Sequence, residues 1–201
     1  MGAMGVMGGT FDPVHYGHLL IAEEARIQFG LDRIIFVTAG RPPHKKDYVV
    51  SDAEHRYAMV ALATASNPFF ECSRMEMDRP GPSYTVDTIE TLRSALAPET
   101  SLYLITGADA IGEILTWHEP RRIVSMCKLI AAHRPGYNLG KLKSRLPKEI
   151  SDQVIFLETP GVYVSSTELR ARVRESRSIK YMTPEPVEAY IHKHALYKDI
   201  K

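Results

Sequence analysis

Short apolar runs alternate with amphipathic segments along this chain, and the alternation predicts its secondary structure. RIIFVTA (33–39) is a continuous apolar run, typical of a strand that is buried on both faces of a parallel sheet. Between Tyr16 and Phe29, apolar residues recur at helical spacing, and Gly30 is a suitable residue to end that helix. The same reasoning predicts strands over 5–9, 33–39, 69–77, 101–107, 128–134 and 153–159, and helices over 16–29, 51–65, 85–96, 110–127 with a break near Pro120, 165–176 and 184–197.

This order of elements predicts one α/β domain over residues 1–201. Strands that are separated by helical segments form βαβ units, so we expect a Rossmann-like, doubly wound, mostly parallel sheet with helices on both faces. The helices within 165–201 are expected to form a small C-terminal cap on the same domain. A chain of 201 residues is long enough for one sizeable core and short for two full domains.

Composition and charge narrow the class of protein. Apolar residues make up 44% and charged residues 24%, the mixture of an ordinary globular protein. A net charge of +1 offers no basic field for nucleic acid, which is therefore not an expected partner. The sequence has no apolar run of about 18 residues, no signal-peptide pattern and, at Cys72 and Cys127, no zinc spacing. We therefore expect a cytoplasmic protein without a membrane partner.

The stretch GGTFDPVHYGH (8–18) is the richest in candidate chemistry. It joins the first predicted strand to the first helix, at the edge where open α/β sheets bind ligands. Gly8 and Gly9 allow a close approach to the backbone and φ values that other residues avoid. His15 and His18 share one face of the helix start, where unpaired N–H groups and the helix dipole favour an anion. The pair predicts an oligophosphate site in preference to two solvated histidines on a capped helix.

This stretch resembles the T/HxGH signature of the nucleotidyltransferase α/β-phosphodiesterase superfamily, in which the histidines bind a nucleotide triphosphate. The superfamily includes class I aminoacyl-tRNA synthetases, phosphopantetheine adenylyltransferases, cytidylyltransferases and the adenylyltransferases of nicotinamide or nicotinate mononucleotide. The signature alone does not choose among them. The ATP site that the resemblance implies comprises Gly8, Gly9, Thr10, Phe11, His15, His18, Gly107, Asp109, Ser165, Ser166 and Arg170.

VSSTELR (164–170) resembles the second motif of the same superfamily, ISSTxxR. Ser165 or Ser166 is a good N-cap, and Glu168 completes a capping box, so this helix start offers backbone donors and hydroxyls to a phosphate. Arg170, one turn further on, is expected to reach a triphosphate with its forked donors. The alternative is a well-capped helix with a surface arginine.

Three other stretches concern the second substrate. The helix that starts near Thr85 in PSYTVDT offers amides to a carboxylate, Asp109 in ITGADA is an acceptor for ribose hydroxyls, and the flat ring of Trp117 suits a pyridine base. Each residue has a plain structural alternative, namely a helix cap or a core position. In the loop GRPPHKK (40–46), Lys45 resembles the phosphate-binding lysine of the superfamily.

Taken in order, GPSYTVDT, GADA, Trp117, HRPGY and VSST resemble the bacterial nicotinate mononucleotide adenylyltransferases along nearly the whole chain. The resemblance implies transfer of the adenylyl group of ATP to nicotinate mononucleotide, giving deamido-NAD and pyrophosphate by direct in-line attack. At His118 relatives often carry tyrosine, so its backbone N–H is the stronger candidate. The implied catalytic residues are His15, His18, Lys45 and Arg170, and the implied nicotinate mononucleotide site comprises Thr10, Lys45, Tyr84, Thr85, Asp109, Trp117 and His118.

Mg²⁺ is the cofactor that this reaction implies. We expect it to be held mainly by ATP phosphates and water, without protein side chains, because the sequence has no evident carboxylate cage. The small-molecule alternatives for the acceptor are nicotinamide mononucleotide and phosphopantetheine. A non-catalytic nucleotide-sensing protein is the alternative of another class, although such a protein would be expected to lose a motif histidine or arginine. The sequence leaves open whether the chain forms a homo-oligomer.

Overall fold

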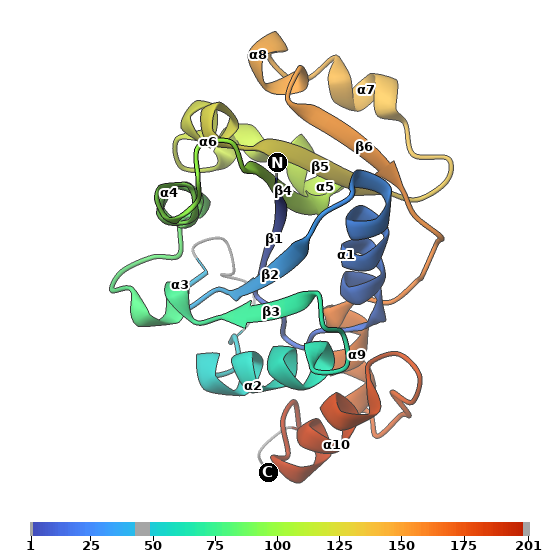
Figure 1. Ribbon diagram of the computed structural model, residues 1–201. Coiled ribbons are helices and arrows are strands. Elements are labelled where there is room, and N and C mark those ends of the chain that lie inside the picture. The colour runs from blue at the N-terminus through green and yellow to red at the C-terminus, as the bar shows by residue number, and fades with distance from the viewer. Residues whose placement is uncertain (1, 43–48, 199–201) are drawn as a thin grey trace.

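Six parallel strands form one sheet in the computed structural model, which describes residues 2–42 and 49–198 (Figure 1). The strand order is β3-β2-β1-β4-β5-β6, so the chain first builds outward from β1 in one direction and then, from β4, in the other. This is the doubly wound arrangement that the sequence predicts. The strands are β1 (Ala3–Gly9), β2 (Arg33–Thr38), β3 (Phe70–Ser73), β4 (Ser101–Gly107), β5 (Lys128–His133) and β6 (Val154–Glu158).

Helices cover both faces of this sheet, and each face has its own hydrophobic cluster. Because side chains alternate along a strand, Leu102 and Leu104 of β4 enter one cluster, whereas Ile105 enters the other. The first face carries α1 (Tyr16–Phe29), α2 (Ala53–Thr64), α9 (Ser166–Arg174) and α10 (Glu185–Lys193). The second carries α4 (Thr85–Ala95), α5 (Ala108–Gly112), the 3₁₀ turn η1 (Ile114–Thr116), α6 (Pro120–Met126), α7 (Leu139–Lys143) and α8 (Lys148–Ser151).

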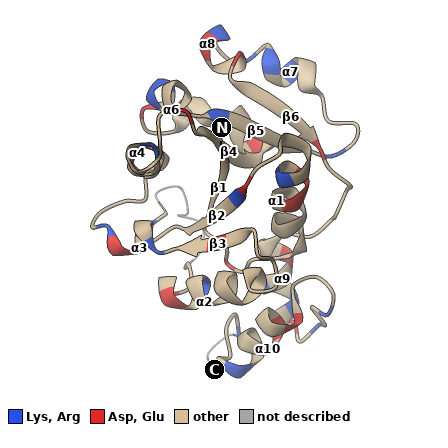
Figure 2. Cartoon of the chain, in the orientation of Figure 1, with Lys and Arg blue, Asp and Glu red and all other residues tan. Residues whose placement is uncertain are grey.

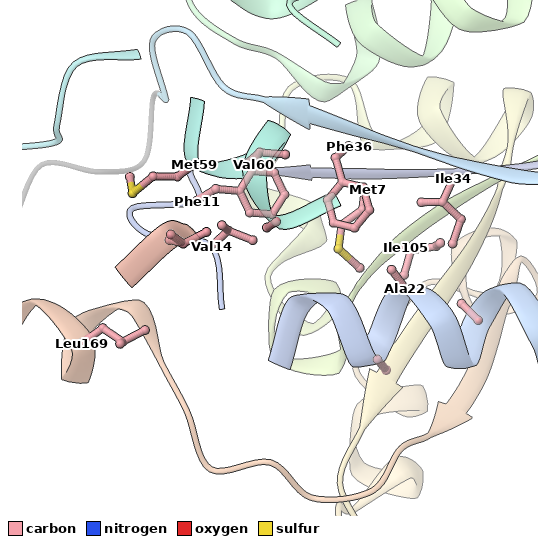
Figure 3. Packing of buried hydrophobic residues seen from close by; sticks show 14 of the residues in the cluster. Met7, Phe11, Val14, Ala22, Ile34, Phe36, Met59, Val60, Ile105 and Leu169 are labelled. Carbon is pink, nitrogen blue, oxygen red and sulfur yellow. The ribbon is translucent and has the colours of Figure 1, made fainter. Parts of the chain in front are cut away.

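The cluster on the α1 face extends beyond the sheet to the loop that joins β1 to α1. Phe11 and Val14 of this loop lie between the Met59–Val60 part of α2 and Leu169 of α9 (Figure 3). Phe11 is 3% exposed and Val14 is fully buried. The expected C-terminal cap is therefore part of the main core, and it packs directly on the segment that carries the candidate chemistry.

Three predicted elements differ from the observed ones. The strand predicted over 69–77 ends at Ser73, because the Ser73 hydroxyl accepts from the N–H of Met75 and the chain turns into the short helix α3 (Met75–Asp78). The helix predicted over 110–127 is split into α5, η1 and α6, the last break being at Glu119 (φ 49°) before Pro120 as expected. The last helix ends at Lys193, and α7 and α8 were not predicted, since helices of four or five residues show no periodicity.

Charged residues of both signs are spread over the outer helices (Figure 2). Many are arranged in exposed ion pairs, such as Arg74 with Glu54 and Lys148 with Asp152. Within residues 2–42 and 49–198, no helix is long and apolar enough to cross a membrane.

Gly40, which follows β2, gives a test of the packing of α3. A Cβ at this position would overlap the carbonyl oxygen of Glu76 and lie 3.0 Å from the Cα of Met77, and backbone atoms cannot step aside. We expect Gly40→Ala to lower the free energy of unfolding in urea by about 1–3 kcal/mol. Gly8→Ala is the matched control, because a Cβ there meets nothing within 4 Å. Equal stability of the two variants would contradict the close contact between β2 and α3.

Candidate functional site

The site lies where β1 and β4 separate at the carboxyl edge of the sheet. These strands pair only as far as Val6 and Leu104, whereas β1 stays paired with β2 up to Gly9. Successive N–H groups of a strand point to opposite neighbours, and the carbonyl of Gly9 accepts from Ala39 on the β2 side. The N–H groups of Gly8 and Thr10 therefore face the gap toward β4. Such a gap, at the point where strand order reverses, is the usual ligand site of a doubly wound sheet.

Two cavities flank this gap and divide the predicted residues between them. The first cavity, of about 300 Å³, lies beside α4 and is lined by Gly8, Gly9, Thr10, Tyr84, Thr85, Trp117 and His118 among others. The second cavity, of about 510 Å³, lies beside α1 and is lined by His15, His18, Gly107 and Asp109 among others. Of the remaining predicted residues, Phe11 is buried in the core, and Ser165, Ser166 and Arg170 line neither cavity. Lys45 lies outside the described residues.

His15 and His18 form a stacked pair at the start of α1. Their ring centroids are 3.8 Å apart, and the Phe11 ring packs edge-on against His18 at 5.1 Å. The backbone N–H of His15 donates to Nδ1 of His18 over 3.2 Å. Nδ1 of His18 is therefore the acceptor, so neutral His18 carries its proton on Nε2. Gly17 leaves room for this arrangement, because a Cβ there would lie 3.0 Å from the His15 ring.

Burial keeps both imidazoles neutral at physiological pH. Loss of hydration lowers the pKa of His15 to about 4. The same effect, with repulsion from His15 as the smaller cause, holds the pKa of His18 well below its ordinary value. The pair thus offers N–H donors rather than positive charge until an anion binds beside it.

The second motif is fastened to the first by side-chain hydrogen bonds. Ser165 caps α9, its hydroxyl accepting from the N–H of Glu168 over 3.1 Å. Ser166 donates its hydroxyl proton to the carbonyl of Pro13 over 2.8 Å, and Nη1 of Arg170 donates to the carbonyl of Asp12 over 2.7 Å. The Ser166 hydroxyl therefore links α9 to the first motif, and the Ser165 hydroxyl accepts from its own helix.

The unusual backbone of the first motif is at Phe11 and not at the glycines. Phe11 has a φ of 49°, whereas neither Gly8 nor Gly9 has a positive φ, so the expectation of unusual φ values at these two glycines is wrong. Gly9 is required for space, because a Cβ would lie 2.8 Å from the Phe11 ring. Gly8 opens onto the first cavity.

Aromatic side chains and a helix start line the outer wall of the first cavity. Trp117 lies there beside His118, whose ring stacks on Tyr84 with centroids 4.5 Å apart. Tyr84 is the N-cap of α4, so Thr85 is the first helical residue and its N–H lies at the positive end of the helix. Trp117 and Thr85 therefore border one cavity although 32 positions separate them in the sequence.

Two buried polar residues that shape the first cavity had no signal in the sequence. Arg56, 1% exposed, donates to the carbonyls of Thr10, Gly40 and Ser51 over 2.8, 3.2 and 2.8 Å. It joins the first motif to both ends of the 40–51 segment. Glu76 lines the cavity itself and accepts from the Thr88 hydroxyl over 2.5 Å, and burial raises its pKa.

In the second cavity, four residues with polar or charged side chains line the wall beside the predicted ones: His133, Arg134, Tyr137 and Thr159. His133 ends β5, Arg134 and Tyr137 follow it, and Thr159 follows β6 at the same edge of the sheet, so HRPGY at the end of a predicted strand was the available signal for the first three. Partial burial and the neighbouring Asp109, which lines the same cavity, raise the pKa of Tyr137. Among the described residues, no three His, Cys, Asp or Glu side chains are grouped so as to hold a metal ion.

Comparison with known proteins places this geometry in a family. Residues 6–172 match the description "Cytidylyltransferase-like". The chain is 54% identical, over 98% of its own length and 92% of the relative's, to a protein of Moorella thermoacetica named "Probable nicotinate-nucleotide adenylyltransferase". A protein of the same name from Thermus thermophilus is 49% identical, with 97% and 99% covered.

A solved structure extends the comparison to the fold. The Plasmodium falciparum nicotinic acid mononucleotide adenylyltransferase, in a complex with NaAD, has a TM-score of 0.81 and 20% identity, with 98% of each chain covered. At this identity, the match concerns the arrangement of helices and strands.

The low pKa of His15 makes a prediction about stability and pH. His15 takes up a proton near pH 6.5 in the unfolded chain and only near pH 4 in the folded chain. The contribution of neutral His15 to the free energy of unfolding is therefore complete above pH 6.5 and is lost as the pH falls toward 4. Between pH 7 and 5, His15 alone removes roughly 2 kcal/mol from the free energy of unfolding. We expect His15→Asn, which keeps an N-cap side chain, to flatten the pH dependence measured by urea unfolding. Parallel curves for wild type and variant would contradict the burial argument.

Proposed function

We propose roles for individual residues on the premise that the chain belongs to the cytidylyltransferase-like family and, within it, to the nicotinate-nucleotide adenylyltransferases. The reaction that it catalyses transfers the adenylyl group of ATP to nicotinate mononucleotide and releases pyrophosphate. We treat residues 1–201 as a single nucleotidyltransferase domain. The observation that carries the assignment of roles is the pair of cavities on either side of the β1–β4 gap, with the two histidines beside it.

Nicotinate mononucleotide binds in the first cavity. Its carboxylate lies at the start of α4, where the N–H of Thr85 and the helix dipole attract an anion, and the backbone N–H of His118 is a second donor. Its pyridine ring packs on Trp117, and Tyr84 supports this wall through its stack on His118. The phosphate then reaches the gap at Thr10.

ATP binds in the second cavity. Asp109 accepts from ribose hydroxyls beside Gly107, at the carboxyl end of β4. The triphosphate runs across the start of α1 toward Arg170 and Ser165, whose helix α9 is fastened to the first motif. Lys45 is the further phosphate ligand in this proposal. Phe11 has an indirect role, since its buried ring supports His18.

The chemistry needs positioning and charge stabilisation more than acid–base catalysis. A phosphate oxygen of the mononucleotide attacks the α-phosphorus of ATP, the bond from that phosphorus to the bridging oxygen breaks, and pyrophosphate leaves with the electron pair. The nucleophile is already an anion near neutral pH, because the second pKa of a phosphate monoester is about 6. His18 donates through Nε2 to the charge that develops on the phosphates, and His15 holds His18 in that tautomer.

A Mg²⁺ ion fits this site only as a partner of the nucleotide. No cluster of three ligating side chains occurs in the part of the chain that the structure describes, so phosphate oxygens and water would be its ligands. When bound, it would neutralise part of the triphosphate charge. The cytoplasmic location and the absence of nucleic-acid and membrane partners stay predictions.

We expect His18→Ala to lower kcat by about 10²–10³, or ~3–4 kcal/mol, because one preorganised donor to the reacting phosphates is lost. The measurement is pyrophosphate release with saturating ATP, Mg²⁺ and nicotinate mononucleotide. The exposed His192 of α10 provides the matched control, and His192→Ala should keep the wild-type rate. A kcat for His18→Ala within a few-fold of wild type would remove His18 from the mechanism.

The acceptor is tested by comparing pyrophosphate release with nicotinate mononucleotide, nicotinamide mononucleotide and phosphopantetheine at equal concentrations. We expect a rate at least about a hundredfold higher with the nicotinate substrate, because the start of α4 binds a carboxylate better than a neutral amide.

Trp117→Ala should raise the KM for the mononucleotide far more than the KM for ATP. Release with none of the acceptors would overturn the function, and equal changes in both KM values would make Trp117 a packing residue.

A further inference from the structure

Tyr197, close to the C-terminus, reaches back to the first motif. Its hydroxyl donates to Oδ1 of Asp12 over 2.8 Å, across 185 positions of sequence. Asp12 is 1% exposed, so its carboxylate depends on protein donors in place of water. Burial and the neighbouring Asp12 raise the pKa of Tyr197, so the hydroxyl keeps the proton that it donates to Asp12.

Asp12 connects three parts of the chain that meet at the site. Its Oδ2 accepts from the N–H of Ser51, just before α2, over 3.2 Å. Its backbone carbonyl accepts from Nη1 of Arg170 over 2.7 Å. The position of Asp12 therefore governs both the turn that leads to His15 and the guanidinium that we assign to the ATP phosphates.

The chain beyond α9 holds this turn at two further points. The Thr183 hydroxyl donates to the carbonyl of Val14 over 2.8 Å, and the N–H of Tyr16 donates to the carbonyl of Met182 over 3.2 Å. Together with the Tyr197 bond, hydrogen bonds from the chain beyond α9 reach residues 12, 14 and 16 of the first motif.

The backbone conformation after α10 places the Tyr197 hydroxyl against Asp12. Ala195 and Tyr197 have φ values of 50° and 65°, in the left-handed region that costs energy for residues other than glycine. The N–H of Leu196 donates to the carbonyl of Ile191 over 3.0 Å, which fastens this turn to the end of α10. The left-handed backbone at Ala195 and Tyr197, on either side of the hydrogen-bonded Leu196, directs the Tyr197 ring toward the turn at Asp12.

We propose that Tyr197 is a positioning residue for the adenylyl transfer: by completing the hydrogen bonds of the Asp12 carboxylate, it fixes the phosphate-binding turn and, through the Asp12 carbonyl, Arg170. This inference rests on the proposed function, in which Arg170 and the histidines hold the ATP phosphates. Tyr197 touches no substrate in this scheme. Its effect should therefore fall on ATP and leave the first cavity, with Trp117, unchanged.

The test is Tyr197→Phe, which removes one oxygen atom and keeps the ring. We expect kcat/KM for ATP to fall about tenfold, the effect of losing one hydrogen bond to a buried charge. Binding of nicotinate mononucleotide without ATP, followed by the fluorescence of Trp117, the sole tryptophan, should stay within twofold of wild type. Tyr181→Phe is the matched control, because that tyrosine is 83% exposed in the same C-terminal part.

A purely structural role would give a different result. It would lower the melting temperature of Tyr197→Phe while kcat/KM for ATP at 25 °C stayed at the wild-type value, and this outcome would overturn the proposal. Asp12→Ala, which removes the acceptor, gives a second test: in that background, Tyr197→Phe should add little to the loss, since both changes remove one hydrogen bond. Additive losses in kcat/KM for ATP would show that Tyr197 does not act through Asp12 and would overturn the proposal. An inactive wild-type protein would instead count against the proposed function, so the two failures are distinguishable.

Discussion

Strands β1 and β4 part after the Val6–Leu104 pair while each stays bonded to its other neighbour, and the rest of the site depends on this separation. A parallel strand that loses a neighbour turns alternate N–H groups toward the gap, here those of Gly8 and of Thr10 just after the strand. The chain reverses its direction of growth at the same point, so the segments after β1 and β4 leave toward opposite faces of the sheet. Two cavities with donors between them follow from that topology.

The electrostatics of this gap suit a ligand that brings its own charge. His15 and His18 are neutral because they are buried, so in the proposed scheme they would donate hydrogen bonds to a triphosphate without repelling the metal ion that accompanies it. Two positive imidazoles stacked 3.8 Å apart would repel each other in the empty site. Burial thus allows the pair to stay stacked, and the bound polyanion favours any protonation that follows.

Local patterns in the sequence were sufficient to identify all six strands and the principal helices. They also singled out the segments 8–18 and 164–170, to which we assign phosphate binding, because glycines, paired histidines and a capped helix start are local features. They missed α3, α7 and α8, which are too short for a period, and they extended the third strand over 74–77, where the Ser73 hydroxyl bonds Met75 and a helical turn begins. Lys45 lies outside the described residues.

How these local features combine depends on contacts between distant segments. Residues 12, 13, 14 and 16 are bonded to residues between 166 and 197, and Ser166 provides the link to Pro13. The same packing divides the predicted residues between two cavities and buries Arg56 and Glu76, the latter in the wall of the first cavity. An arginine in a helix or a tyrosine near a C-terminus carries no local sign of its partner, because its defining hydrogen bond closes a loop of 46 or 185 residues. Such bonds exist only once the core has brought the segments together.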